Sequence, residues 1–170
     1  MKPWFTFADV VTALRLPLAV LFPFLRPPAA QLAVVAVAAA SDFFDGILAR
    51  RFGGSRVGPF IDPVADKAFM VAAFLTVATR GGLHPFEIAA VLLRDIVAAL
   101  GFAGSWMLRR PVALPARAGG KAVTVGQLLT LVAFIAESPL VRPLAWATAA
   151  IAVYATWDYG RAAARVAARR

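Results

Sequence analysis

The sequence predicts an all-α integral membrane protein, a polytopic bundle of six transmembrane helices with both termini in the cytoplasm. Hydrophobic residues make up 61% of the 170 residues and charged residues 16%, against about 25% charged residues in ordinary soluble domains. The apolar residues form long runs, and a helix needs about 20 such residues to cross a bilayer. The net charge of +9 comes with 13 Phe and 4 Trp. This composition excludes a disordered basic arm and a soluble nucleic-acid-binding protein.

Proline and glycine separate the predicted spans, because both residues are unfavourable in a helix interior. The breaks fall at Pro27-Pro28, Gly53-Gly54, Gly81-Gly82, the 111–120 segment and Pro139, and each span is the apolar run between two breaks. In order, the spans are predicted at Phe7–Leu25, Ala29–Ala49, Asp62–Thr79, Pro85–Leu108, Ala122–Glu137 and Leu140–Ala163. No repeat or linker divides the chain, so residues 1–170 are predicted to form a single transmembrane domain.

The cations indicate the orientation of these spans, because cytoplasmic loops of membrane proteins accumulate Lys and Arg. The loops opposite the N-terminus hold only Arg26, Arg80 and Arg142. The loops and tails on the side of the N-terminus hold twelve cations: Lys2, Arg50, Arg51, Arg56, Arg109, Arg110, Arg117, Lys121, Arg161, Arg165, Arg169 and Arg170. This bias predicts that both termini are cytoplasmic, which agrees with an even number of spans.

Four of the nine acidic residues lie within 25 residues, at the end of the second predicted span and the start of the third. Asp42 and Asp45 are three residues apart and Asp62 and Asp66 are four apart, so each pair shares one face of a helix. Clustered carboxylates repel one another unless they share protons or surround a cation. Oxygen ligands without Cys or His suit Mg²⁺, Mn²⁺ or Ca²⁺, and Mg²⁺ is usually completed by substrate phosphates. The cluster therefore predicts a phosphorylated ligand.

The segment Asp42–Arg50 followed by Gly58–Asp66 resembles the signature of the CDP-alcohol phosphatidyltransferases, D-x2-D-G-x2-A-R, a spacer and G-x3-D-x3-D. All eight fixed positions of this signature are present, and the spacer has seven residues, one fewer than is common in the family. An Asn is more usual in the family where Asp9 stands. Stretches similar to bacterial phosphatidylglycerophosphate synthases lie at Asp9–Pro17, Asp62–Lys67, Leu93–Ile96 and Gly120–Thr124.

The resemblance implies a phospholipid-synthesising transferase in the cytoplasmic membrane of a bacterium, with its active site facing the cytoplasm. Its members displace CMP from CDP-diacylglycerol by the hydroxyl of a small polar alcohol, and the family also implies a homodimer. Two Mg²⁺ or Mn²⁺ ions would be bound by Asp42, Asp45, Asp62 and Asp66, and Asp66 would also be the catalytic base. The CDP-binding residues would be Thr12, Asp42, Gly46, Ala49, Arg50 and Gly58.

The signature leaves the acceptor alcohol open. Glycerol 3-phosphate, which gives phosphatidylglycerophosphate, is the preferred hypothesis, and phosphatidylglycerol, inositol phosphate and serine are the alternatives. An anionic acceptor needs cations beyond the metal, and Arg94 would be costly within the fourth predicted span without a partner. The candidate residues for the acceptor phosphate are Arg94, Arg117, Lys121 and Thr124.

Several structural interpretations compete with these assignments. The four aspartates would form a purely structural ion-pair network with neighbouring cations, Arg94 would pair with Asp95 between helices, and Arg117 and Lys121 would only set the topology. A small ion or proton transporter is an alternative of a different class, because intramembrane carboxylates also mark ion pathways. That alternative predicts acidic residues distributed along the depth of the bundle. A catalytically inactive member of the family is a third hypothesis.

Overall fold

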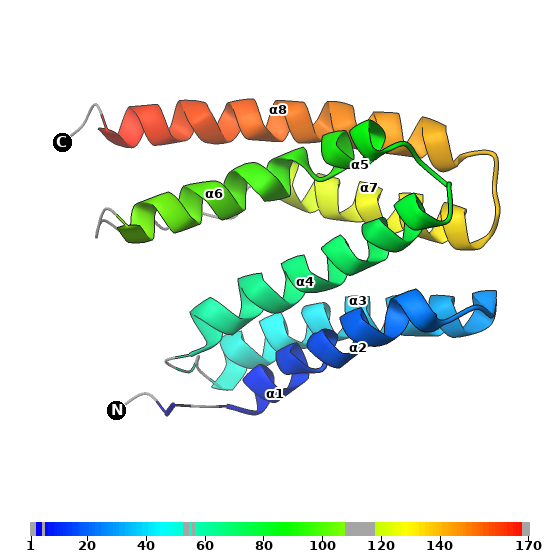
Figure 1. Cartoon of the computed structure of the whole chain (residues 1–170). Helices are drawn as coiled ribbons and strands as arrows, with labels where there is room; N and C mark the ends of the chain where they lie inside the picture. Colours follow the sequence, from blue (N-terminus) through cyan, green and yellow to red (C-terminus); the bar gives the residue numbers. More distant parts are fainter. Residues whose placement is uncertain (1–2, 5, 53–54, 56, 108–117, 168–170) are drawn as a thin grey trace. The chain divides into compact units, whose positions relative to one another are not determined.

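The structure is a computed structural model, which describes residues 3–4, 6–52, 55, 57–107 and 118–167. Every regular element in these residues is helical, which confirms the predicted all-α class (Figure 1). The elements are α1 (Phe7–Ala13), α2 (Arg15–Leu21), the short 3-10 helix η1 (Phe22–Phe24), α3 (Pro28–Phe52), α4 (Gly58–Thr79), α5 (Pro85–Val91), α6 (Leu93–Met107), α7 (Ala118–Ile135) and α8 (Val141–Ala167).

These helices follow the six predicted apolar segments, with shifted ends and two interruptions. The first predicted span is divided into α1, α2 and η1, and the fourth is divided into α5 and α6. The second extends to Phe52, the third begins at Gly58, and the fifth begins at Ala118. Leu108, the predicted end of the fourth span, lies outside the described residues.

Pro17 explains the interruption of the first apolar segment. A proline has no backbone N–H and cannot bond to the carbonyl four residues earlier, which is that of Ala13, the last residue of α1. The chain passes through Leu14 and resumes as α2 at Arg15. The break therefore places Arg15 at the start of a new helix. Pro23 has a similar effect at the end of α2, where the chain tightens into η1.

The interruption at Leu92 has no proline or glycine next to it, and a side chain from α7 supports it. The amide of Asp95 bonds to the carbonyl of Leu92 (2.9 Å), which leaves the carbonyl of Val91 without its usual helical partner. The Nε2 of Gln127 donates to that Val91 carbonyl at 3.1 Å. Because a buried backbone carbonyl needs a partner, the buried Gln127 stabilises the break.

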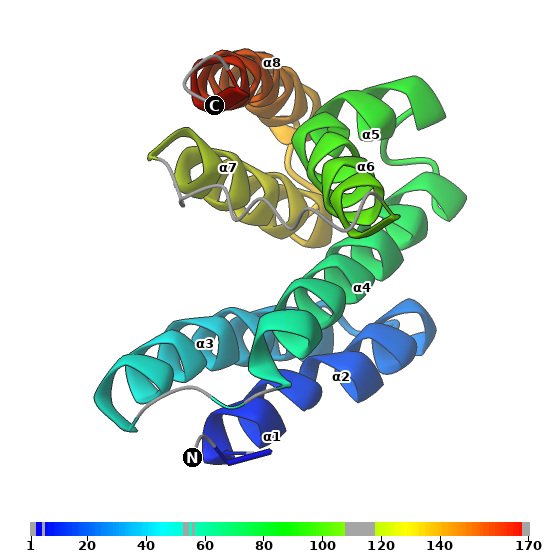
Figure 2. The ribbon, with the colours of Figure 1, turned by 90° about the vertical axis from the view of Figure 1, so that its left-hand side faces the viewer.

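The chain divides into two compact units, Met1–Arg80 and Gly81–Arg170, which we call the N-terminal unit and the C-terminal unit. In the N-terminal unit, α1 packs against α3 and α4, and α2 packs against α4 (Figure 2). Phe22 is fully buried and its ring meets the edge of Phe69, with 6.0 Å between centroids. The guanidinium of Arg80 donates to the carbonyls of Pro23 and Leu25 and so ties the end of α4 to the end of η1.

In the C-terminal unit, α7 and α8 pack along a seam of small residues, and α5 and α6 also contact α8. Val123, Ala152 and Ala155 form a buried apolar cluster between the two helices. Two glycines of α7 allow close approach: a Cβ at position 119 would lie 3.2 Å from the Cβ of Ala155, and one at position 126 would lie 2.5 Å from the Oγ1 of Thr148. Larger residues at these positions would separate the helices.

One helix in the described part of the chain is long and apolar enough, by length and composition, to cross a membrane. It is α3, whose window Pro28–Asp45 has a mean hydropathy of 1.2, and α7 holds a shorter apolar stretch, Gly119–Ile135. Large apolar side chains are nevertheless exposed on other helices, among them Val71, Leu100 and Val153. The predicted topology of six spans with cytoplasmic termini stays a prediction.

We expect Gly126→Ala to destabilise the packing of α7 on α8. The new Cβ would meet Thr148, which is buried and whose hydroxyl donates to the carbonyl of Leu144 (2.7 Å). Overpacking of this kind costs about 1–3 kcal/mol. The loss would appear as a lower midpoint in thermal unfolding of the purified protein.

Gly160→Ala in α8 is the matched control, because a Cβ there meets no atom within 4 Å and alanine is the better helix former. Its unfolding temperature should equal or exceed that of the wild type. Adding Thr148→Ala to Gly126→Ala removes the clashing Oγ1 and should restore part of the loss. If Gly126→Ala unfolded at the wild-type temperature, the proposed packing of the seam would be wrong.

Candidate functional site

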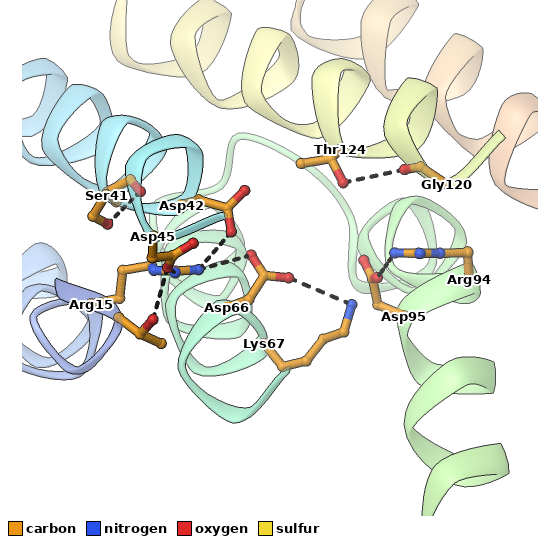
Figure 3. Close-up of polar contacts among 12 residues, drawn as sticks. Arg15, Ser41, Asp42, Asp45, Asp66, Lys67, Arg94, Asp95, Gly120 and Thr124 are labelled. Atoms are coloured by element: carbon orange, nitrogen blue, oxygen red, sulfur yellow. Dashed lines mark hydrogen bonds and ion pairs between the residues drawn. The ribbon is translucent and has the colours of Figure 1, made fainter. Parts of the chain in front are cut away.

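Three of the four clustered aspartates contact one buried arginine in the N-terminal unit (Figure 3). Arg15 is the first residue of α2, and its side chain is only 2% exposed. Its Nη1 donates to the Oδ1 of Asp42 at 2.9 Å, and its Nη2 donates to the Oδ2 of Asp45. The same Nη1 lies 3.9 Å from the Oδ1 of Asp66. Arg15 thereby joins α2 to the C-terminal part of α3 and to α4.

The charges around Arg15 do not cancel among the described side chains. Asp42, Asp45 and Asp66 carry three negative charges, and Arg15 and Lys67 carry two positive charges. The Nζ of Lys67 lies 3.9 Å from the Oδ2 of Asp66. The Asp42 side chain is 56% exposed, so this carboxylate is open to solution on one side while Arg15 holds it from the interior. Asp42 is therefore a carboxylate of the cluster that a solute can reach.

Thr12 of α1 forms a hydrogen bond with the carboxylate of Asp45. Its side chain is fully buried, and its Oγ1 donates to the Oδ2 of Asp45 at 2.8 Å. Arg15 donates to the same carboxylate oxygen. Thr12 was predicted to line a CDP site, and the structure places its hydroxyl against a carboxylate of the cluster.

Asp9 fixes the start of α1 and the turn before α4. Its Oδ2 accepts hydrogen bonds from the backbone N–H (2.5 Å) and the hydroxyl (2.9 Å) of Thr6, the N-cap residue of α1. Its Oδ1 accepts from the Oγ of Ser55 at 2.8 Å. That Ser55 oxygen in turn accepts from the backbone N–H groups of Val57 (3.1 Å) and Gly58 (2.6 Å). Because α4 begins at Gly58, this network sets the position from which α4 presents Asp66.

Some predicted site residues fall outside what the structure describes. Asp62 lies in α4, one turn before Asp66, and its side chain is not among those described. The same holds for the side chains of the α3 residues Gly46, Ala49 and Arg50. Arg117 lies wholly outside the described residues. Among the side chains that are described, no three His, Cys, Asp or Glu residues form a group that could hold a metal ion.

A second polar cluster lies in the C-terminal unit, around Asp95 of α6. Asp95 is buried, its Oδ1 accepts from the Nη1 of Arg94 (2.9 Å), and its Oδ2 accepts from the Nε2 of Gln127 (2.6 Å). The Arg94 guanidinium also lies over the ring of Tyr159, 5.9 Å from its centroid. The ion pair joins adjacent residues of α6, and Gln127 provides the connection between helices.

Two other residues predicted for the acceptor phosphate, Lys121 and Thr124, lie near the start of α7. A Cβ at position 120 would be 2.7 Å from the Nη2 of Arg94, so the guanidinium rests against the backbone of Gly120. The hydroxyl of Thr124 donates to the Gly120 carbonyl (3.2 Å; Figure 3), and Lys121 is exposed. Arg94 therefore lies against Gly120, in the first turn of α7. Lys121 and Thr124, which are also predicted to bind the acceptor phosphate, follow Gly120 in the sequence.

Sequence reasoning gave no site role to Arg15, Asp9 or Gln127. The charge of Arg15 within an apolar segment was the available signal, because an ionised group there is costly without partners. Its partners could not be identified, because Asp42 and Asp45 lie on another helix. Asp9 carried a similar signal, because it also lies within the first predicted span, whereas Gln127 is uncharged and carried none.

Comparison with known proteins gives one family. A family model described as CDP-alcohol phosphatidyltransferase matches residues 5–157 of the chain. A Mycobacterium tuberculosis (strain CDC 1551 / Oshkosh) protein named "Probable phosphatidylglycerophosphate synthase" is 36% identical over 114 residues, which cover 66% of this chain and 52% of the relative. The chain thus spans about half the length of that relative.

Two further relatives are covered more fully. A Yersinia pestis (strain Pestoides F) protein named "CDP-diacylglycerol--glycerol-3-phosphate 3-phosphatidyltransferase" is 32% identical over 139 residues, covering 78% of this chain and 74% of the relative. A protein of the same name from Sodalis glossinidius (strain morsitans) matches with the same identity and the same coverage.

Proposed function

The chain belongs to the CDP-alcohol phosphatidyltransferase family, and from this premise we propose that it transfers the phosphatidyl group of CDP-diacylglycerol to an alcohol and releases CMP. The observation that carries the proposal is that Asp42, Asp45 and Asp66 all contact the Arg15 guanidinium. All of these residues lie inside the segment that matches the family. The names of the Yersinia and Mycobacterium relatives favour glycerol 3-phosphate as the acceptor. The product would then be phosphatidylglycerophosphate.

The proposal includes two divalent metal ions, which would be Mg²⁺ or Mn²⁺. The donors are of the type that such ions prefer, because they are carboxylate oxygens, and two of them already contact a positive group, the Arg15 guanidinium. Asp42, Asp45, Asp62 and Asp66 would hold the metal. When bound, the ions would supply charge neutralisation for the diphosphate and for the departing CMP.

The protein's own residues would bind the nucleotide and move one proton. Gly46 and Ala49, which follow Asp45 in the sequence, would leave room for the diphosphate to approach, Arg50 would add a guanidinium for a phosphate, and Gly58, the first residue of α4, would complete the CDP site. Thr12 would orient the Asp45 carboxylate through the hydrogen bond that its hydroxyl donates.

Asp66 would accept the proton of the acceptor hydroxyl. As that proton leaves, the hydroxyl oxygen bonds to the phosphatidyl phosphorus and the bond from phosphorus to the CMP oxygen breaks. Both the Arg15 and the Lys67 contact of Asp66 are 3.9 Å long, whereas Arg15 lies within hydrogen-bond distance of Asp42. Asp66 is also the last of the four aspartates and lies one helical turn after Asp62 on α4, and this position makes it the proposed base.

An anionic acceptor would also require a cation outside the carboxylate cluster. Arg94 is the first candidate, because the buried Asp95 carboxylate, which also accepts from Gln127, accepts a hydrogen bond from its guanidinium. Lys121, Thr124 and Arg117 are the other candidates, from their place in the sequence.

The proposal includes a six-span topology in a bacterial cytoplasmic membrane. α3, α4 and α8 have 25, 22 and 27 residues, and at 1.5 Å per residue each is long enough for roughly 30 Å of hydrocarbon. Outward-facing apolar side chains on several helices support a lipid-covered surface. The bias of twelve cations toward the side of the N-terminus supports a cytoplasmic location for that side, where the carboxylate cluster at the end of α3 would also lie.

The purified protein, in detergent with CDP-diacylglycerol and Mg²⁺ or Mn²⁺, should release CMP when glycerol 3-phosphate is added. CMP release would be followed for glycerol 3-phosphate, phosphatidylglycerol, inositol phosphate and serine in parallel. Release with another acceptor alone would keep the reaction and replace the acceptor. An absence of release with every acceptor, from protein that stays folded, would refute the enzymatic proposal.

Asp66→Asn should lower turnover by a factor of about 100 to 10,000, the usual contribution of a general base, and leave binding of CDP-diacylglycerol largely intact. The matched variant is Asp42→Asn, which should lose both turnover and binding, because Asp42 would hold metal at the diphosphate. Turnover would be followed by CMP release and binding by equilibrium titration. If Asp66→Asn lost binding as fully as Asp42→Asn, Asp66 would act primarily as a metal ligand, and its role as the base would be refuted.

A further inference from the structure

The Arg15 guanidinium contacts the same carboxylates that the proposed function assigns to metal. Both of its terminal nitrogens donate to them, one to Asp42 and one to Asp45. We propose that Arg15 is the internal counter-ion of the metal site, which neutralises Asp42 and Asp45 in the metal-free protein and competes with a divalent cation for them. This inference rests on the proposed function, because the metal ligands themselves are part of that proposal.

The charges explain why a counter-ion is needed. Asp42 and Asp45 are three residues apart on α3, and like charges at this spacing destabilise a helix. Asp45 is also buried, and a buried carboxylate is costly without a partner of opposite charge. Arg15 satisfies both requirements in the absence of any metal ion. Its replacement by a neutral residue would remove the positive charge that contacts both carboxylates, and a bound divalent cation could then take its place.

The direction of approach allows competition between Arg15 and a metal ion. Arg15 is 2% exposed and reaches the carboxylates from the interior, whereas the Asp42 side chain is 56% exposed. An ion from solution would therefore arrive on the open side of Asp42, with the guanidinium behind it. Two positive groups at such short range repel each other, so Arg15 should weaken metal binding while it stabilises the metal-free protein.

Arg15 does not use all of its hydrogen-bond donors among the described residues. Its Nε is buried and has no hydrogen-bond partner among the described residues, although a guanidinium can donate five hydrogen bonds.

The test compares Arg15→Gln with the wild type in the full chain, in detergent, by two measurements. Mn²⁺ affinity would be measured by the EPR signal of free Mn²⁺, and the unfolding temperature would be measured in EDTA and in saturating Mn²⁺. We expect Arg15→Gln to bind Mn²⁺ about tenfold more tightly, as removal of one nearby positive charge implies. Its unfolding temperature should fall in EDTA and recover most of the loss in Mn²⁺.

Arg80→Gln is the matched control. Arg80 belongs to the same unit and also joins two segments, but its guanidinium donates to the backbone carbonyls of Pro23 and Leu25. Its replacement should lower the unfolding temperature equally with and without Mn²⁺ and leave the Mn²⁺ affinity unchanged. If Arg15→Gln behaved in the same way as Arg80→Gln, Arg15 would be a structural residue only and the inference would be overturned.

Two other outcomes are also decisive. If wild-type protein that is active in the CMP assay bound no Mn²⁺, the metal part of the proposed function and this inference would fall together, while the transferase activity would stand. If Arg15→Gln did not fold under either condition, Arg15→Lys would decide, because it keeps the charge and loses the two-armed contact. A stability loss in EDTA that Mn²⁺ reverses would support the inference, and an equal loss under both conditions would overturn it.

Discussion

The contact between the Arg15 guanidinium and the carboxylates of α3 is the interaction on which the N-terminal unit depends. It joins the start of α2 to Asp42 and Asp45, and it extends toward Asp66 on α4. A buried ion pair is a demanding arrangement, because the loss of either partner leaves an uncompensated charge in a medium of low polarity. The geometry of the carboxylate cluster and the packing of the first four helices are therefore set by the same contact.

The interruptions of the helices serve this arrangement. Pro17 ends α1 at Ala13 and so allows Arg15 to begin a new helix, and Asp9 with Ser55 fixes the turn that leads into α4. In the C-terminal unit, Gln127 bonds both to the carbonyl freed at a helix break and to the carboxylate that holds a neighbouring arginine. In both units, polar side chains thus stabilise irregular backbone and at the same time orient a charged group.

The sequence predicted those features that depend on local pattern. Apolar runs between Pro and Gly predicted the helical segments closely, and the spacing of Asp42 and Asp45 predicted a shared face. Contacts between distant segments could not be predicted from local pattern. Arg15, for example, contacts the carboxylates of Asp42 and Asp45, which lie 27 and 30 residues away in the sequence. The break at Leu92 was also missed, because it depends on a side chain of α7. The pairing of Arg94 with Asp95 was one of the alternatives drawn from the sequence, and it forms within α6 and not between helices.

A double-mutant cycle between Arg15 and Asp45, measured on the full chain without added metal, tests the central claim most directly. The free energies of unfolding of Arg15→Gln, Asp45→Asn and the double variant would be compared with that of the wild type. If the two charges stabilise each other across a buried contact, the double variant will lose less than the two single losses together, by at least about 1 kcal/mol. Losses that add to within about 0.3 kcal/mol would contradict the account.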